Sequence, residues 1–124
     1  MNKICTDLLQ SRGFIELGIN IDTADMHYMY RHWEIDENTI GEQRDANIGF
    51  DSDFYHGADN GKTYHYIPAW SLTALLELMP KNYVVEKCSD SYCCYNLTVK
   101  EFFANTAVDA AFKMVCWLKE NGKI

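Results

Sequence analysis

The sequence IPAWSLTALLELMP, residues 67–80, encodes a short apolar helix with a proline near each end. Pro68 favours an extended conformation at the residue before it, and the Ser71 hydroxyl can accept a backbone N–H as an N-cap. Apolar residues then recur at the three- and four-residue spacing that builds one helix face, and Pro80 ends the helix. These apolar residues are Leu72, Leu75, Leu76 and Met79. The stretch predicts a core helix, with Trp70 packed at its entry, and carries no catalytic motif.

Two further segments have the pattern of amphipathic helices. Residues 6–17 can begin at Thr6, which is a good N-cap, and end at Gly18. Their predicted apolar contacts are Leu8, Leu9, Ile15 and Leu17. Residues 107–121 follow Thr106, which resembles a capping box with Asp109. The predicted buried face of this third helix consists of Val108, Ala111, Phe112, Val115 and Leu118.

Strand signals separate these helices. Residues 26–35 are rich in aromatic side chains with a period near two, which suits a strand. Residues 83–88 and 92–97 predict two strands joined by a polar turn at residues 89–91. We therefore expect an α+β fold, in which three helices pack on one face of a small antiparallel sheet, in two layers.

Composition favours a compact cytoplasmic protein. The 124 residues are 48% hydrophobic and 14% aromatic, which predicts a single domain over residues 1–124. The chain has neither a signal-peptide pattern nor an apolar run of about 18 residues, so secretion and membrane association are not expected. Its five cysteines are an odd number without CxxC spacing, which fits reduced thiols in the cytoplasm.

The net charge of −7 is concentrated in one part of the chain. Residues 34–63 hold eight acidic residues against Arg44 and Lys62, which gives −6, whereas the rest of the chain carries only −1. A basic stripe for phosphate is absent, so direct nucleic-acid binding is not expected. Because residues 36–63 contain many Gly, Asn and Asp without a clear period, they predict a long acidic loop, with a short hairpin at Asn60-Gly61. A loop of this length is a candidate functional segment.

Several pieces of the chain share a resemblance. They are Thr23-Ala24-Asp25-Met26, residues 67–80, Asp109-Ala110-Ala111-Phe112 and Leu118-Lys119-Glu120. Together they resemble uncharacterised small proteins that phages and integrated mobile elements of gut bacteria encode. The resemblance implies a phage or mobile-element setting and no particular activity, so it assigns no site residues.

Metal and ligand sites are a weaker alternative reading of the acidic loop. His27 and His32 are an odd number of residues apart on a predicted strand, so they point to opposite faces. His56 and His65 could meet near Asp51, Asp53 or Asp59, which would supply suitable ligand types. The same aspartates do not match an EF-hand, because Tyr55 stands where an oxygen ligand belongs. No metal or cofactor is therefore assigned.

The cysteines offer a second catalytic alternative. Cys5 and Cys116 are most simply small core residues. Cys93 and Cys94 are adjacent on a predicted strand, so one should be buried and the other partly exposed, with Cys88 opposite Cys93 across the turn. No base is predictably close to either thiol, and the sequence contains no catalytic signature. An enzyme is therefore not the favoured reading.

The acidic loop and its flanking aromatic residues suggest a protein-binding surface. If Tyr64 and Tyr66 are exposed beside the carboxylates, they form an aromatic and acidic patch suited to a basic partner. We therefore expect a non-enzymatic interaction module, and the alternative is a small-ligand or metal-binding domain, enzymatic or not, around residues 51–65. Homo-oligomer formation is left open. The predicted partner-binding residues are Asp51, Asp53, Asp59, Tyr64 and Tyr66.

Overall fold

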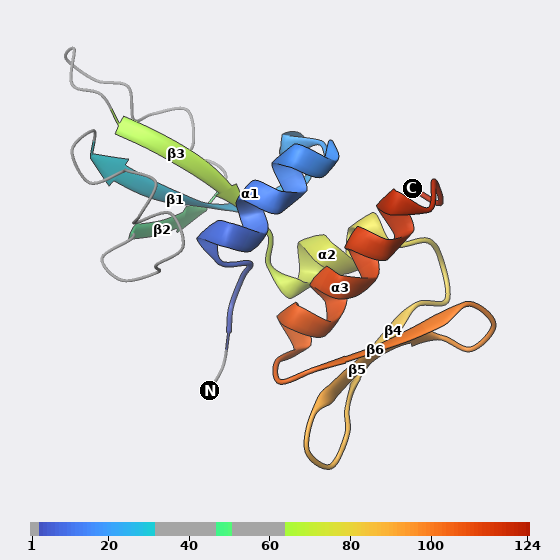
Figure 1. The fold of residues 1–124 in the computed structure, drawn as a ribbon. Helices are drawn as coiled ribbons and strands as arrows, with labels where there is room; N and C mark the ends of the chain where they lie inside the picture. The colour runs from blue at the N-terminus through green and yellow to red at the C-terminus, as the bar shows by residue number, and fades with distance from the viewer. Residues whose placement is uncertain (1–2, 32–46, 51–63) are drawn as a thin grey trace. The chain divides into compact units, whose positions relative to one another are not determined.

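The computed structural model describes residues 3–31, 47–50 and 64–124 of the chain. They belong to two compact units: one is Asp7–Trp70, and the other combines Met1–Thr6 with Ser71–Ile124. Each unit contains a three-stranded antiparallel sheet (Figure 1). The structure therefore has two centres of packing, each with its own sheet.

The unit Asp7–Trp70 is built on a sheet with the strand order β2-β1-β3. Its elements are α1 (Leu8–Leu17), the 3-10 helix η1 (Ile21–Thr23), β1 (Met26–Arg31), β2 (Asn47–Phe50) and β3 (Tyr64–Ala69). Both outer strands pair antiparallel with β1. The sequence does not predict β3, which contains Pro68 opposite His27. An edge strand tolerates this proline because one side of the strand has no partner to receive a backbone hydrogen bond.

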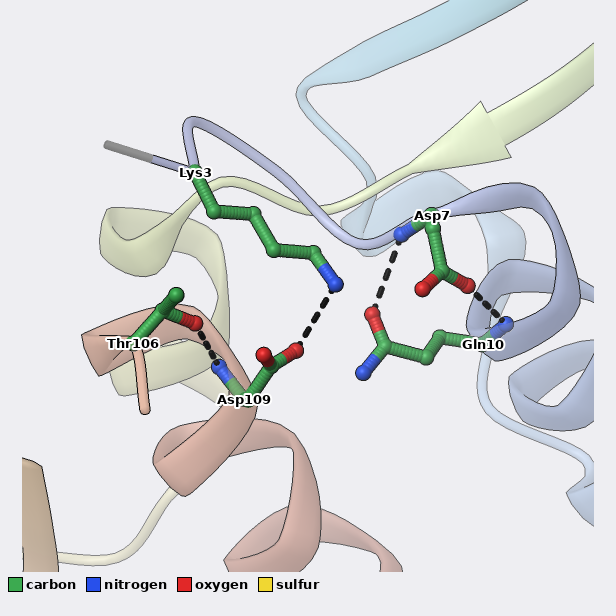
Figure 2. A network of polar contacts seen from close by, with 5 residues as sticks. All are labelled: Lys3, Asp7, Gln10, Thr106 and Asp109. Atoms are coloured by element: carbon green, nitrogen blue, oxygen red, sulfur yellow. Dashed lines mark hydrogen bonds and ion pairs between the residues drawn. The ribbon is translucent and has the colours of Figure 1, made fainter. Parts of the chain in front are cut away.

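Asp7 caps α1, where the sequence predicts Thr6. The Asp7 carboxylate accepts the backbone N–H of Gln10 at 2.7 Å, and the Gln10 side-chain oxygen accepts the backbone N–H of Asp7 at 3.0 Å (Figure 2). This reciprocal pair is a capping box. The helix ends at Gly18 as predicted, since this residue has a φ of 85°, a left-handed conformation that glycine adopts without strain.

The buried face of α1 differs from the predicted one. Leu8, Ser11 and Phe14 are buried, whereas Leu9 and Ile15 are exposed. The buried positions recur every three residues, which is a true helical face. The prediction of Leu8 is confirmed, whereas Ser11 and Phe14 take the places that the sequence analysis gives to Leu9 and Ile15.

Trp70 lies in the core of this unit, as the sequence predicts. The residue is fully buried, and its ring meets that of Phe14 edge to face, with the ring centroids 5.0 Å apart. The indole Nε1 donates a hydrogen bond to Thr23 Oγ1 at 2.9 Å. Burial of the large ring is therefore combined with a partner for its one polar atom.

The second unit consists of two helices and a meander of three strands. Its elements are α2 (Leu72–Leu78), β4 (Val84–Lys87), β5 (Tyr92–Asn96), β6 (Lys100–Ala104) and α3 (Ala107–Glu120). The strand order is β4-β5-β6, α3 packs against all three strands, and α2 packs against α3. The N-terminal segment joins this unit through an isolated bridge between Cys5 and Ser71. The predicted hairpin of residues 83–97 is confirmed, and β6 is an additional strand.

Both helices of this unit begin at the predicted caps. The hydroxyl of Ser71 accepts the N–H of Ala74 at 3.2 Å, and that of Thr106 accepts the N–H of Asp109 at 3.0 Å. The Asp109 carboxylate is 2.7 Å from Lys3 Nζ, so an ion pair ties the N-terminal segment to the first turn of α3 (Figure 2). A carboxylate at this position is also favoured by the helix dipole.

The predicted α+β class is confirmed. The expected single sheet is wrong, because β1 pairs with β2 and β3, while the hairpin strands β4 and β5 pair with each other and with β6. β1 begins at Met26 as predicted and ends at Arg31. Residues 32–35 of the predicted strand lie outside the described residues.

Most of the predicted acidic loop, including the hairpin at Asn60-Gly61, also lies outside the described residues. The exception is β2 (Asn47–Phe50), which falls within the predicted loop and pairs with β1. Two acidic segments, 32–46 and 51–63, are therefore separated by a strand. The sequence misses this strand because Gly49 and the Asn/Asp-rich surroundings give no strand signal.

Candidate functional site

The strands of the unit Asp7–Trp70 position the ends of both acidic segments. Segment 32–46 leaves the sheet after Arg31 and returns at Asn47, and segment 51–63 leaves after Phe50 and returns at Tyr64. Tyr64 lies opposite Arg31, and Asn47 lies opposite Met29, which is two residues before Arg31 on β1. Three of the four attachment points therefore lie at the same end of β1.

The predicted partner-binding residues divide into two groups. Asp51, Asp53 and Asp59 lie outside the described residues. Tyr64 and Tyr66 belong to β3, where they pair with Arg31 and Met29, and their side chains are outside the described part of the structure. Both tyrosine positions thus lie on the strand that follows segment 51–63, and their part in partner binding stays a prediction.

The histidines do not form a described metal site. His27 is buried in the central strand β1, and His65 is paired with Tyr30 on β3. His32 and His56 lie outside the described residues, as do Asp51, Asp53 and Asp59, the predicted companions of His56 and His65. Within the described ranges, no three His, Cys, Asp or Glu side chains are grouped so as to hold a metal ion.

The second unit presents a sheet face that the sequence does not predict as a site. Figure 1 shows α3 along one side of the sheet β4-β5-β6. Phe102 faces this helix, since its ring lies 6.5 Å from that of Trp117. Because neighbouring residues of a strand point to opposite faces, Phe103 belongs to the other side. We call this other side the open face; by strand register it contains Val84, Glu86, Cys93, Tyr95, Glu101 and Phe103.

Carboxylates control the electrostatics of the open face. The Tyr95 hydroxyl contacts Glu86 at 3.4 Å, and the Cys93 thiol contacts Glu101 at 3.9 Å. The negative charge of Glu86 raises the pKa of Tyr95. Burial, followed by the charge of Glu101, raises the pKa of Cys93. Both shifts mean that this face disfavours further negative charge.

Cys93 and Cys94 are both buried, so the prediction of one exposed thiol is wrong. Cys94 lies on the face that α3 covers and contacts Met79 Sδ at 3.8 Å, whereas Cys93 lies on the open face, where it contacts Glu101. Cys88 is not directly opposite Cys93, because Glu86 occupies that position. A nearby carboxylate and burial both disfavour the thiolate, which is the reverse of what activates a catalytic cysteine.

Two thiols, Cys94 on β5 and Cys116 on α3, should resist alkylation in the native protein. Burial raises the pKa of Cys94 to about 12 and that of Cys116 to about 11. At pH 8 we expect iodoacetamide to modify each more than about a hundredfold more slowly than free cysteine, because only the thiolate reacts. Peptide mass spectrometry after timed quenching measures both rates, and in denaturant all five cysteines should react alike. Native Cys94 modified as fast as free cysteine would contradict this prediction.

The same shift links stability to alkaline pH. The pKa of Cys94 rises from 9.0 to about 12 on folding, so the unfolded chain loses this proton first. The stabilising contribution of the neutral thiol is complete below about pH 9 and is lost as the pH rises towards 12. Replacing Cys94 with alanine removes this part of the pH dependence.

Comparisons with protein-family models, curated proteins and solved structures give no match to this chain. In the part of the chain that the structure describes, every helix is too short or too polar to cross a membrane.

Proposed function

We propose that this chain is a non-enzymatic accessory protein of a phage or mobile element, which acts in the cytoplasm by binding a partner protein with a basic surface. The binding surface is residues 34–63 together with the flanking Tyr64 and Tyr66. The proposal of a phage or mobile-element origin depends on the sequence resemblance alone. The cytoplasmic assignment is supported by the five cysteines, none of which forms a disulfide.

The observation that carries this proposal is the attachment of both acidic segments to one small sheet. Residues 34–63 contain eight of the eighteen acidic residues of the chain. The register of β1 with β2 and β3 brings three of the four segment ends to one end of that sheet. Negative charge that the sequence concentrates is thus attached to one rigid support, which favours long-range attraction of a basic partner.

A matched pair of variants tests this proposal. The binding variant is D51N/D53N/D59N, and the control variant, D22N/E77Q/E120Q, removes the same charge from exposed positions elsewhere. Wild type and both variants are immobilised, and proteins captured from a bacterium that carries the gene are identified by mass spectrometry. Each captured protein is then purified and its affinity measured by calorimetry at low and physiological salt.

We expect a basic partner whose affinity falls about tenfold in the binding variant, stays unchanged in the control and weakens with salt. Equal affinity for the binding variant and wild type would overturn the proposal. So would a titration in which D51N/D53N/D59N abolishes binding of Zn²⁺ or Ca²⁺, because that result supports the alternative metal-binding reading.

A further inference from the structure

We infer that the open face of the sheet β4-β5-β6 is a second docking surface, which binds a cationic, apolar segment of a partner protein. This surface belongs to the unit that contains Ser71–Ile124 and shares no residue with the acidic segments. It is therefore a separate site from the proposed function above, and either can fail alone.

The open face exposes large apolar side chains around a buried residue at its centre. Phe103 is 51% exposed and Val84 is 41% exposed, whereas Cys93 between them is only 3% exposed. Phe103 on β6 pairs directly with Cys93 on β5, and Val84 on β4 pairs with Tyr95 on β5. The face thus offers one aromatic residue on each strand of the β5-β6 ladder, Tyr95 and Phe103, beside the buried Cys93, as anchor sites in protein interfaces do.

The charge on this face determines the chemistry of the partner. Glu86 and Glu101 are exposed on opposite sides of Cys93, on strands β4 and β6. None of the six residues of the open face is basic, and neither carboxylate forms an ion pair with the described residues. Glu86 lies 3.4 Å from the Tyr95 hydroxyl and Glu101 lies 3.9 Å from the Cys93 thiol, so each carboxylate borders a side chain of this face. Lysine or arginine side chains of a partner would supply the missing positive charge.

The same charge disfavours a second copy of this chain as the occupant. Stacking two identical open faces would bring the carboxylates of Glu86 and Glu101 together in pairs of like charge, in a chain with a net charge of −7. Extension of the sheet at β6 is also hindered, because Lys113 Nζ already donates to the Phe103 carbonyl at 2.7 Å. A cationic segment that lies across the face meets neither obstacle.

The test uses the full-length chain labelled with ¹⁵N and two synthetic peptides with the same leucine pattern. One peptide has lysine at every polar position, and the other has glutamate. We expect the Lys/Leu peptide to shift the amide resonances of β4, β5 and β6, and the Glu/Leu peptide to leave them unchanged. E86Q/E101Q should weaken the dissociation constant about three- to tenfold, and F103A at least about fivefold.

The control variant is E77Q/E120Q, which removes two exposed carboxylates outside the open face and should bind like wild type. The inference is overturned if E86Q/E101Q binds the Lys/Leu peptide as tightly as wild type does. It is also overturned if both peptides shift the face equally, or if the shifts fall only in residues 34–63. Sedimentation of the free chain tests whether a second copy of the chain binds the open face instead. Self-association that F103A abolishes would assign the face to that second copy and overturn the inference.

Discussion

Replacing Trp70 with alanine is expected to lower the free energy of unfolding by about 3–5 kcal/mol. The indole is fully buried, so its removal exposes a cavity in the core of the unit Asp7–Trp70. The same change removes the edge-to-face contact with Phe14 and leaves Thr23 without the hydrogen bond from Nε1. Urea unfolding followed by far-UV circular dichroism measures the loss, and amide hydrogen exchange in β1 and β3 locates it.

Two variants separate the contributions to this loss. Trp70→Phe retains an aromatic ring and lacks the donor to Thr23, so it should cost less than Trp70→Ala. Leu9→Ala truncates a side chain of the same unit that is 65% exposed, and we expect a change within about 0.5 kcal/mol. An unfolding midpoint for Trp70→Ala equal to that of wild type would show that this core does not depend on the indole.

Local signals explain why the helices are predicted well. Ser71 and Thr106 bond to the backbone three residues later, so both caps can be read directly from the sequence. Gly18 ends α1 for an equally local reason, its left-handed conformation. The buried side of α1 is not local information, because it depends on what packs against the helix. Ser11 is buried there while Leu9 is exposed, contrary to their polarity.

Strand pairing explains why the sheets are predicted less well. The sequence shows the alternation of β4 and β5, and the hairpin turn between them is short. It does not show that β1 pairs with β2 and β3 instead of this hairpin, because pairing joins residues that are far apart in the chain. β3 is concealed by Pro68, and β6 has adjacent aromatic residues, Phe102 and Phe103, instead of alternation.

The two candidate sites also differ in whether local sequence or long-range strand pairing defines them. The acidic segment is visible in composition alone, since charge can be counted without a structure. The open face is not visible, because Glu101 and Phe103 join Glu86 and Tyr95 only through the register of three strands. A period-two reading of residues 83–88 and 92–97 could have placed Glu86 and Tyr95 on one face, but it gives no reason to expect that this face stays uncovered.

The second large effect is expected in the other unit, from Leu118→Ala. Leu118 is fully buried on α3, the helix that covers β4, β5 and β6. Truncation to alanine removes buried apolar atoms and leaves a cavity that the surrounding side chains fill only in part. We expect the free energy of unfolding to fall by about 2–5 kcal/mol, measured by urea titration, with faster amide exchange in α3 and β5.

The same substitution at an exposed leucine provides the control for this prediction. Leu97 follows β5 and is 91% exposed, so Leu97→Ala removes the same atoms without opening a cavity. We expect the free energy of unfolding to change by no more than about 0.5 kcal/mol. The difference between the two variants isolates burial beneath α3 from the chemistry of the side chain. If both variants lost stability equally, the burial of Leu118 on α3 would not be a source of stability in this unit.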